Sequence, residues 1–166
     1  MKTQAERDEY RARFENVDFR RNPEKYRIGR SEEGVLSVEP YKSEILPHWR
    51  FKTPEIAEES AQKIYQMFLD YLAQNDFVGA DMSRKFLQMG YTRSRRYANH
   101  ASGKKYAGAV PKELRGVSGA HGRDELPKDV DEEKAESARR FYGYYKRAKE
   151  NEQYKQMLGA HKEKYG

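Results

Sequence analysis

A helix that begins at Thr53 is the feature that most constrains the fold. Thr53 is a favourable N-cap, Pro54 suits the first helical position, and Glu55 suits the positive end of the helix dipole. After this start, apolar and small residues recur at helical spacing, namely Ile56, Ser60, Ala61, Ile64, Phe68, Leu69 and Leu72. The pattern predicts a long helix with one buried face.

Capping signals and periodicity predict further helices. The sequence Thr3-Gln-Ala-Glu6 is a capping box, which predicts a helix over about residues 4–14. Two short helices are expected at about 79–89 and 92–99, with Gly90 as the stop between them. A last helix is expected over about 131–158, weakened in its middle by Gly143.

Residues 34–39, Gly-Val-Leu-Ser-Val-Glu, are the one β signal, bounded by glycine and by Pro40. We expect one strand of a hairpin there, and an irregular segment over 40–52 that Trp49 pins to the core. The expected fold class is mainly α with a small β element (α+β), a compact helical single domain over residues 16–158. An N-terminal helix or mobile arm would precede it over 1–15, and a mobile tail would follow over 159–166.

The composition is that of a folded domain with a thin, aromatic-rich core. Leu, Ile, Val and Phe number only 26 of 166, but the net charge is a modest +6 and 13 tyrosines add apolar surface. The absence of cysteine excludes disulfides and Cys-ligated zinc or iron–sulfur sites. No apolar run reaches the roughly 18 residues of a membrane span, and the charged N-terminus does not match a signal peptide. We expect a cytoplasmic protein with no membrane contact and no cofactor.

Positive charge is concentrated in a 31-residue window without Asp or Glu, from Met82 to Lys112. The window carries +8, so the rest of the chain sums to −2. A solvated helix normally mixes both signs of charge, whereas a field of one sign attracts phosphate. The candidate nucleic-acid- or phosphate-binding residues are Arg84, Lys85, Arg93, Arg95, Arg96, Tyr97, Asn99, His100, Lys104 and Lys105. The alternative is a surface whose acidic complement comes from elsewhere, such as Glu55, Glu58 and Glu59.

The expected helix, Gly90 and helix would also suit a helix-turn-helix. However, Phe86 stands where close helix approach needs a small residue, and Arg96 stands where the second helix should point inward. We therefore favour a plain helical corner over a DNA-reading helix.

Two carboxylates just before the window, Asp76 and Asp81, would suit a phosphoryl-transfer or nuclease site beside arginines. The simpler interpretation is that they cap the second helix or pair with Arg84 and Lys85. The four histidines are scattered along the chain without HExxH-type spacing, so no metal site is predicted, and no catalytic residue is assigned.

Two long stretches resemble a known family. Residues 39–52, EPYKSEILPHWRFK, and residues 76–100, DFVGADMSRKFLQMGYTRSRRYANH, are similar to an uncharacterised family of small microbial and viral cytoplasmic proteins, a domain of unknown function. The similarity covers about residues 18–154. The family tends to carry a small residue at Ser83 and a glycine-rich basic continuation, which here is Ala101-Ser-Gly-Lys-Lys-Tyr106. The resemblance implies no particular activity.

Three functions remain open at this point. The leading hypothesis is an accessory protein that binds nucleic acid or another polyanion through residues 82–112. The second is an enzyme acting on a phosphorylated substrate or nucleic acid, with Asp76 or Asp81 and His100 near the arginines. The third is an adaptor whose basic window docks an acidic protein partner. The sequence does not indicate an oligomeric state.

Overall fold

The structure, a computed structural model, describes residues 1–29, 34–99, 106–114, 119–124 and 131–166. These residues form α1 (Gln4–Ala12), α2 (Tyr41–Ile45), α3 (Pro54–Ala73), α4 (Phe77–Asn99), α5 (Glu132–Glu150) and α6 (Glu152–Tyr165). Short 3-10 turns lie at Pro23–Lys25, Leu46–His48 and Lys112–Leu114. The mainly helical fold is therefore confirmed. None of the described helices is long and apolar enough to cross a membrane.

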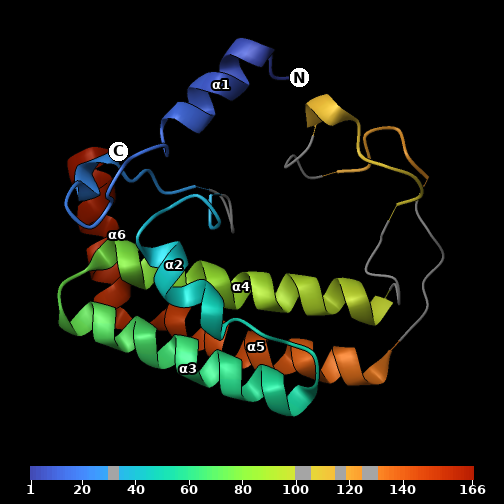
Figure 1. The fold of residues 1–166 in the computed structure, drawn as a ribbon. Helices are drawn as coiled ribbons and strands as arrows, with labels where there is room; N and C mark the ends of the chain where they lie inside the picture. Colours follow the sequence, from blue (N-terminus) through green and yellow to red (C-terminus); the bar gives the residue numbers. More distant parts are fainter. Residues whose placement is uncertain (30–33, 100–105, 115–118, 125–130) are drawn as a thin grey trace.

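The core is a bundle of α3, α4 and α5, each packed on the other two. Helix α4 runs antiparallel to its two neighbours, and α2 lies along it (Figure 1). The bundle encloses large side chains from all three helices, including Ile64, Phe68, Leu72, Phe86, Leu87 and Phe141. Helix α6 packs at the end where α4 begins, whereas α1 stands away from the bundle and has no buried residue.

The predicted helix starts at Thr3 and Thr53 are confirmed. Thr53 Oγ1 accepts a hydrogen bond from the Ile56 amide at 3.2 Å. In the capping box, the Glu6 amide donates to Thr3 Oγ1 at 3.2 Å, and the Thr3 amide donates to the Glu6 carboxylate at 2.6 Å. Both starts were predictable because an N-cap depends on residues only three positions apart.

The predicted β element at 34–39 is wrong. Residues 34–37 form a turn in which the Ser37 amide donates to the Gly34 carbonyl at 3.0 Å, and Gly34 has a φ of +81°. Val35 and Val38, three positions apart, are the buried pair, whereas a half-buried strand would bury alternate residues. The described part of the chain contains no strand that would pair with this run.

The predicted break at Gly90 is also wrong, because α4 continues through it from Phe77 to Asn99. Gly90 is buried, and a Cβ atom at this position would lie 2.3 Å from Cδ1 of Phe141 in α5. The glycine therefore serves close helix approach and does not end the helix. With no turn at this point, the helix-turn-helix arrangement is excluded.

The C-terminal helix of 131–158 is divided at Asn151. Asn151, with a ψ of 125°, ends α5, and its side chain accepts from the Tyr154 amide at 2.9 Å to begin α6. Helix α6 extends to Tyr165, into the segment 159–166 for which we expect a mobile tail, and it carries the buried His161.

Trp49 anchors the segment before α3, as predicted. Its indole N–H donates to the Phe86 carbonyl of α4 at 3.1 Å, and its ring meets the Phe86 ring edge-on. The segment is less irregular than expected, since it contains α2 and the turn Leu46–His48.

Two mid-helix glycines provide a matched test of the packing at Gly90. We expect Gly90→Ala to lower the free energy of unfolding by roughly 1–3 kcal/mol, because the added methyl group must displace the Phe141 ring. Gly143→Ala should raise it by roughly 0.5–1 kcal/mol, since a Cβ there meets no atom within 4 Å. Urea unfolding followed by the fluorescence of Trp49 measures both changes. Equal stabilisation by the two substitutions would contradict the close contact.

Candidate functional site

Helix α4 divides the predicted binding residues into two groups with different environments. From Phe77 to Leu87 every residue is buried, because α2, α3, α5 and α6 and the N-terminal segment surround this half. Beyond Gln88 one face of the helix is open to solvent. The acid-free window therefore does not form one continuous basic surface.

The second half of α4 carries the exposed cations. Arg93, Arg95 and Arg96 are exposed, and none of them has an ion-pair partner among the described residues. Tyr97 and Asn99 are half-buried, and the Tyr97 ring lies 5.8 Å from the ring of Phe51. The remaining predicted residues, His100, Lys104 and Lys105, lie outside the described residues.

Arg84 and Lys85, by contrast, belong to a buried cluster around Asp81. Asp81 is fully buried, while Arg84 is 8% and Lys85 1% exposed. Arg84 Nη2 lies 2.7 Å from the Asp81 carboxylate, and Lys85 Nζ lies 4.0 Å from it. These two residues therefore do not take part in an exposed basic surface. The simpler interpretation of Asp81, as a partner of the two cations, is confirmed.

Two tyrosines from distant parts of the chain complete the cluster. Tyr154 of α6 donates its hydroxyl to Asp81 at 2.6 Å, and Tyr26 of the N-terminal segment donates to the other oxygen. Arg84 Nε also donates to the Tyr154 hydroxyl at 3.1 Å. His161 of α6 lies beside Tyr26, with Nε2 2.6 Å from the Tyr26 carbonyl oxygen. The local sequence gives no signal for Tyr26 or Tyr154, because both meet Asp81 only through the tertiary fold.

The cluster keeps Asp81 ionised. Burial alone would raise its pKa, but the charges of Arg84 and Lys85 and the two tyrosine hydroxyls outweigh burial, so the pKa of Asp81 is lowered. Burial and the adjacent Asp81 carboxylate raise the pKa of Tyr26 and of Tyr154 well above the usual tyrosine value. Both phenols therefore remain protonated hydrogen-bond donors at neutral pH.

The other candidate carboxylate, Asp76, has a structural role. It accepts from the Gly79 amide at 3.0 Å and so caps α4, and the Tyr41 hydroxyl donates to it at 2.7 Å. Arg20 lies 3.8 Å from the same carboxylate. Asp76 is thus engaged at the helix start, as the simpler interpretation predicted, and no group of three potential metal ligands occurs in the described parts of the chain.

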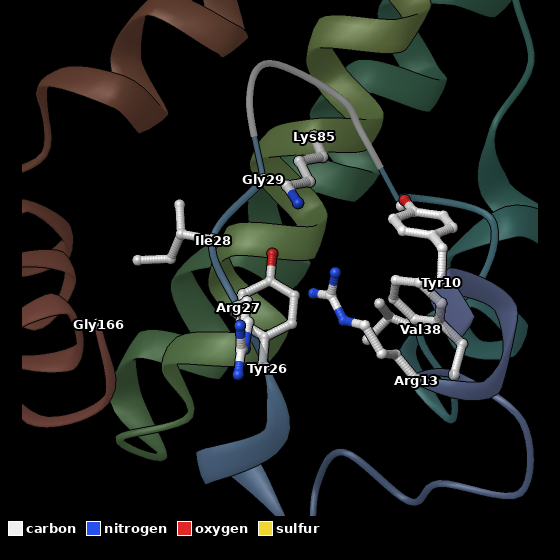
Figure 2. A pocket seen from close by; sticks show the side chains of 11 residues that line it. Tyr10, Arg13, Tyr26, Arg27, Ile28, Gly29, Val38, Lys85 and Gly166 are labelled. Atoms are coloured by element: carbon white, nitrogen blue, oxygen red, sulfur yellow. The ribbon is translucent and has the colours of Figure 1, made fainter. Parts of the chain in front are cut away.

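A cavity of about 330 Å³ lies beside the buried cluster, between α1 and the first half of α4. Lys85 forms part of its wall, together with Arg13 at the end of α1 and Arg27 on the segment after Tyr26. Figure 2 shows the Lys85 amine and the Arg13 guanidinium pointing into the same space, near the Tyr26 hydroxyl. Sequence reasoning missed Arg13 and Arg27, which lie far from the basic window in the chain.

Comparison with known protein families identifies a family for this chain. Residues 9–164 match the family described as a domain of unknown function, DUF4385. The chain belongs to this family. No curated protein and no solved structure matches it. The DUF4385 match extends from within α1 into the last turn of α6, so it includes both halves of α4, the Asp81 cluster and, except for Gly166, the residues that line the cavity. The resemblance to an uncharacterised family is confirmed, and the family itself carries no assigned activity.

The Asp81 cluster predicts a specific loss of stability on substitution. We expect Asp81→Asn to lower the free energy of unfolding at pH 7 by about 3–5 kcal/mol, because Arg84 and Lys85 would stay buried beside a neutral amide. Asp70→Asn on the exposed surface of α3 is the matched control, with an expected change of less than about 0.5 kcal/mol. Urea unfolding monitored by Trp49 fluorescence measures both variants.

The stability difference between wild type and Asp81→Asn should also depend on pH. The pKa of Asp81 is lower in the folded than in the unfolded chain. The stabilisation that the Asp81 charge provides is therefore complete above the unfolded pKa of about 3.9, and it is lost as the pH falls through the folded pKa. The stability difference between wild type and Asp81→Asn should therefore shrink below about pH 4. A difference that stays constant down to pH 2 would show that the charge of Asp81 is not what stabilises the fold.

Proposed function

We propose that the protein binds nucleic acid, or a comparable phosphate polyanion, through the second half of α4. The observation that carries this proposal is the set of three exposed guanidinium groups, Arg93, Arg95 and Arg96, without an ion-pair partner in the described part of the chain. Guanidinium groups bind phosphate oxygens through two parallel N–H donors, which makes arginine the usual residue at such surfaces.

Several arginines elsewhere in the protein do have an acidic partner close by. Arg20 pairs with Glu44 at 2.6 Å, Arg84 pairs with Asp81, and Arg139 and Arg140 both pair with Glu136. The arginines of α4 beyond Gln88 differ because the sequence supplies no acid within the same or the next turn. When a helix segment has no acidic residue near its cations, those cations are available to an anion from solution.

The helical dipole offers a competing explanation, which is incomplete. Cations in the last turn of a helix interact favourably with its negative end, and this accounts for Arg96. The effect decays within one turn, whereas Arg93 lies six residues before Asn99. The helix dipole therefore does not explain all three arginines, whereas contact with a phosphate-rich ligand does.

Aromatic groups beside the arginines supply stacking surfaces. Tyr91, one turn before Arg95, lies 5.1 Å from Tyr142 of α5, whose side chain is 45% exposed. Exposed tyrosine next to a row of cations is a common arrangement in proteins that bind single-stranded nucleic acid, since bases stack on the ring while phosphates meet the cations. This favours nucleic acid over an acidic protein as the partner.

The proposal predicts a salt-dependent interaction that the arginines control. Fluorescence anisotropy with labelled single- and double-stranded oligonucleotides across a salt series would measure it. Substituting all three arginines with alanine should weaken binding and reduce the salt slope by about 2–3, because each lost phosphate contact removes about 0.7–0.9.

A charge-matched control distinguishes binding by this local surface from a general effect of net positive charge. Replacing Lys146, Arg147 and Lys149 of α5 with alanine removes the same charge from another exposed surface and should leave most of the binding intact. Equal losses in the two triple variants, or no binding by wild type at low salt, would contradict the proposal. Displacement by an acidic peptide as strong as by an oligonucleotide would point to an adaptor instead.

A further inference from the structure

We propose that the surface on the second half of α4 selects single-stranded nucleic acid, with the strand crossing α4 and bases stacking on aromatic rings on both sides of the helix. The inference rests on the proposed function, since it names the form of nucleic acid that the same three arginines would bind. It adds a second aromatic pair, Phe51 and Tyr97, to the pair of Tyr91 and Tyr142 described above.

The helical period divides the open half of α4 into two flanks with a ridge between them. Tyr91 and Arg95 are four residues apart and so lie on one flank. Arg93 and Tyr97 have the same spacing and lie on the other flank. Arg96 is exposed between the two pairs, on the side of α4 that faces away from the bundle. Each flank therefore combines one tyrosine ring with one exposed guanidinium group.

The contacts of the two tyrosines agree with this arrangement. Tyr91 lies beside Tyr142 of α5, with the ring centroids 5.1 Å apart. Tyr97 lies beside Phe51, in the segment before α3, with the ring centroids 5.8 Å apart. The two aromatic pairs thus join α4 to different neighbours. Because a helix with its side chains is only about 10–12 Å across, a short stretch of strand that crosses α4 can reach both pairs.

Tyr142 offers the most accessible of these rings. It is 45% exposed, and no cation among the described residues lies over its ring. The next two tyrosines of α5 differ in this respect. Arg147 lies over the ring of Tyr144, 5.1 Å from its centroid. Lys149 lies over the ring of Tyr145 at 5.9 Å. A base can therefore stack on Tyr142 without displacing a cation of the protein itself.

Rings beside cations distinguish a single strand from a duplex. In a duplex each base is paired and stacked between its neighbours, so its face is not free to meet Tyr142 or Tyr97, whereas the bases of a single strand can turn outward and stack on such rings. Cations alone would favour the duplex, because its phosphate charge is denser and each contact releases more counterions. A preference for single strands is therefore the property that the rings add to the arginines.

Fluorescence anisotropy with three labelled probes of equal length tests the proposal on the full chain. The probes are a mixed-sequence single strand, the duplex of that strand, and an abasic strand that keeps the phosphates without the bases. We expect the single strand to bind at least about tenfold more tightly than the duplex, and at least about fivefold more tightly than the abasic strand, since only the single strand offers free base faces.

Substitutions of the rings separate stacking from charge. Tyr142→Leu should weaken binding of the single strand by about fivefold or more and leave the salt slope unchanged, because it removes a ring but no phosphate contact. Tyr142→Phe keeps the ring and should bind like wild type. Tyr97→Leu and Tyr97→Phe repeat the comparison on the other flank. Tyr165→Leu, which replaces an exposed tyrosine of α6, is the matched control and should leave binding unchanged.

Three results would each overturn the inference. These are duplex binding as tight as single-strand binding, equal affinity for the abasic strand, and equal affinity of Tyr142→Leu and Tyr142→Phe for the single strand. Salt-dependent binding that the three arginines control would in each case still support the proposed function. Absence of any binding by wild type at low salt would contradict both proposals, so the two failures are distinguishable.

Discussion

The arrangement of the chain depends on the hydrogen bonds and ion pairs of the buried Asp81 carboxylate. It accepts hydrogen bonds from Tyr26 and Tyr154, which lie 55 and 73 residues away, and pairs with Arg84 one turn along α4. An isolated buried charge is very costly, so these partners have to be present together. The N-terminal segment, α4 and α6 are therefore joined at Asp81, and burial of its charge is favourable only when all of these partners are in place.

This requirement divides α4 into an enclosed half and an open half. The N-terminal segment reaches Asp81 through Tyr26, and α6 reaches it through Tyr154, so both cover the first three turns of the helix. Neither reaches the turns that carry Arg93, Arg95 and Arg96, which remain exposed. Burial thus assigns different roles to cations that look equivalent in sequence, since all of them stand in one acid-free window.

The parts of the fold that the sequence predicts are those set by neighbouring residues. Thr53 and Thr3 cap their helices through atoms three positions away, so their signals are local and their predictions are correct. Gly90 was misjudged because its role is decided by Phe141, a partner 51 positions further along the chain. The burial of Arg84 and Lys85 depends in the same way on Tyr26 and Tyr154, and the cavity residues Arg13 and Arg27 meet α4 only after folding.

Two cations of α4, Lys85 and Arg96, show how far burial separates residues on one side of a helix. Lys85 and Arg96 are eleven residues apart, which is three helical turns or about 16 Å along the axis, so their side chains project from nearly the same side. Lys85 lies beneath the N-terminal segment and α1, whereas Arg96 is exposed. The two cations therefore lie on one side of the same helix but in opposite environments. The Asp81 cluster, by joining the N-terminal segment and α6 to α4, is what separates the buried cations of this helix from its exposed ones.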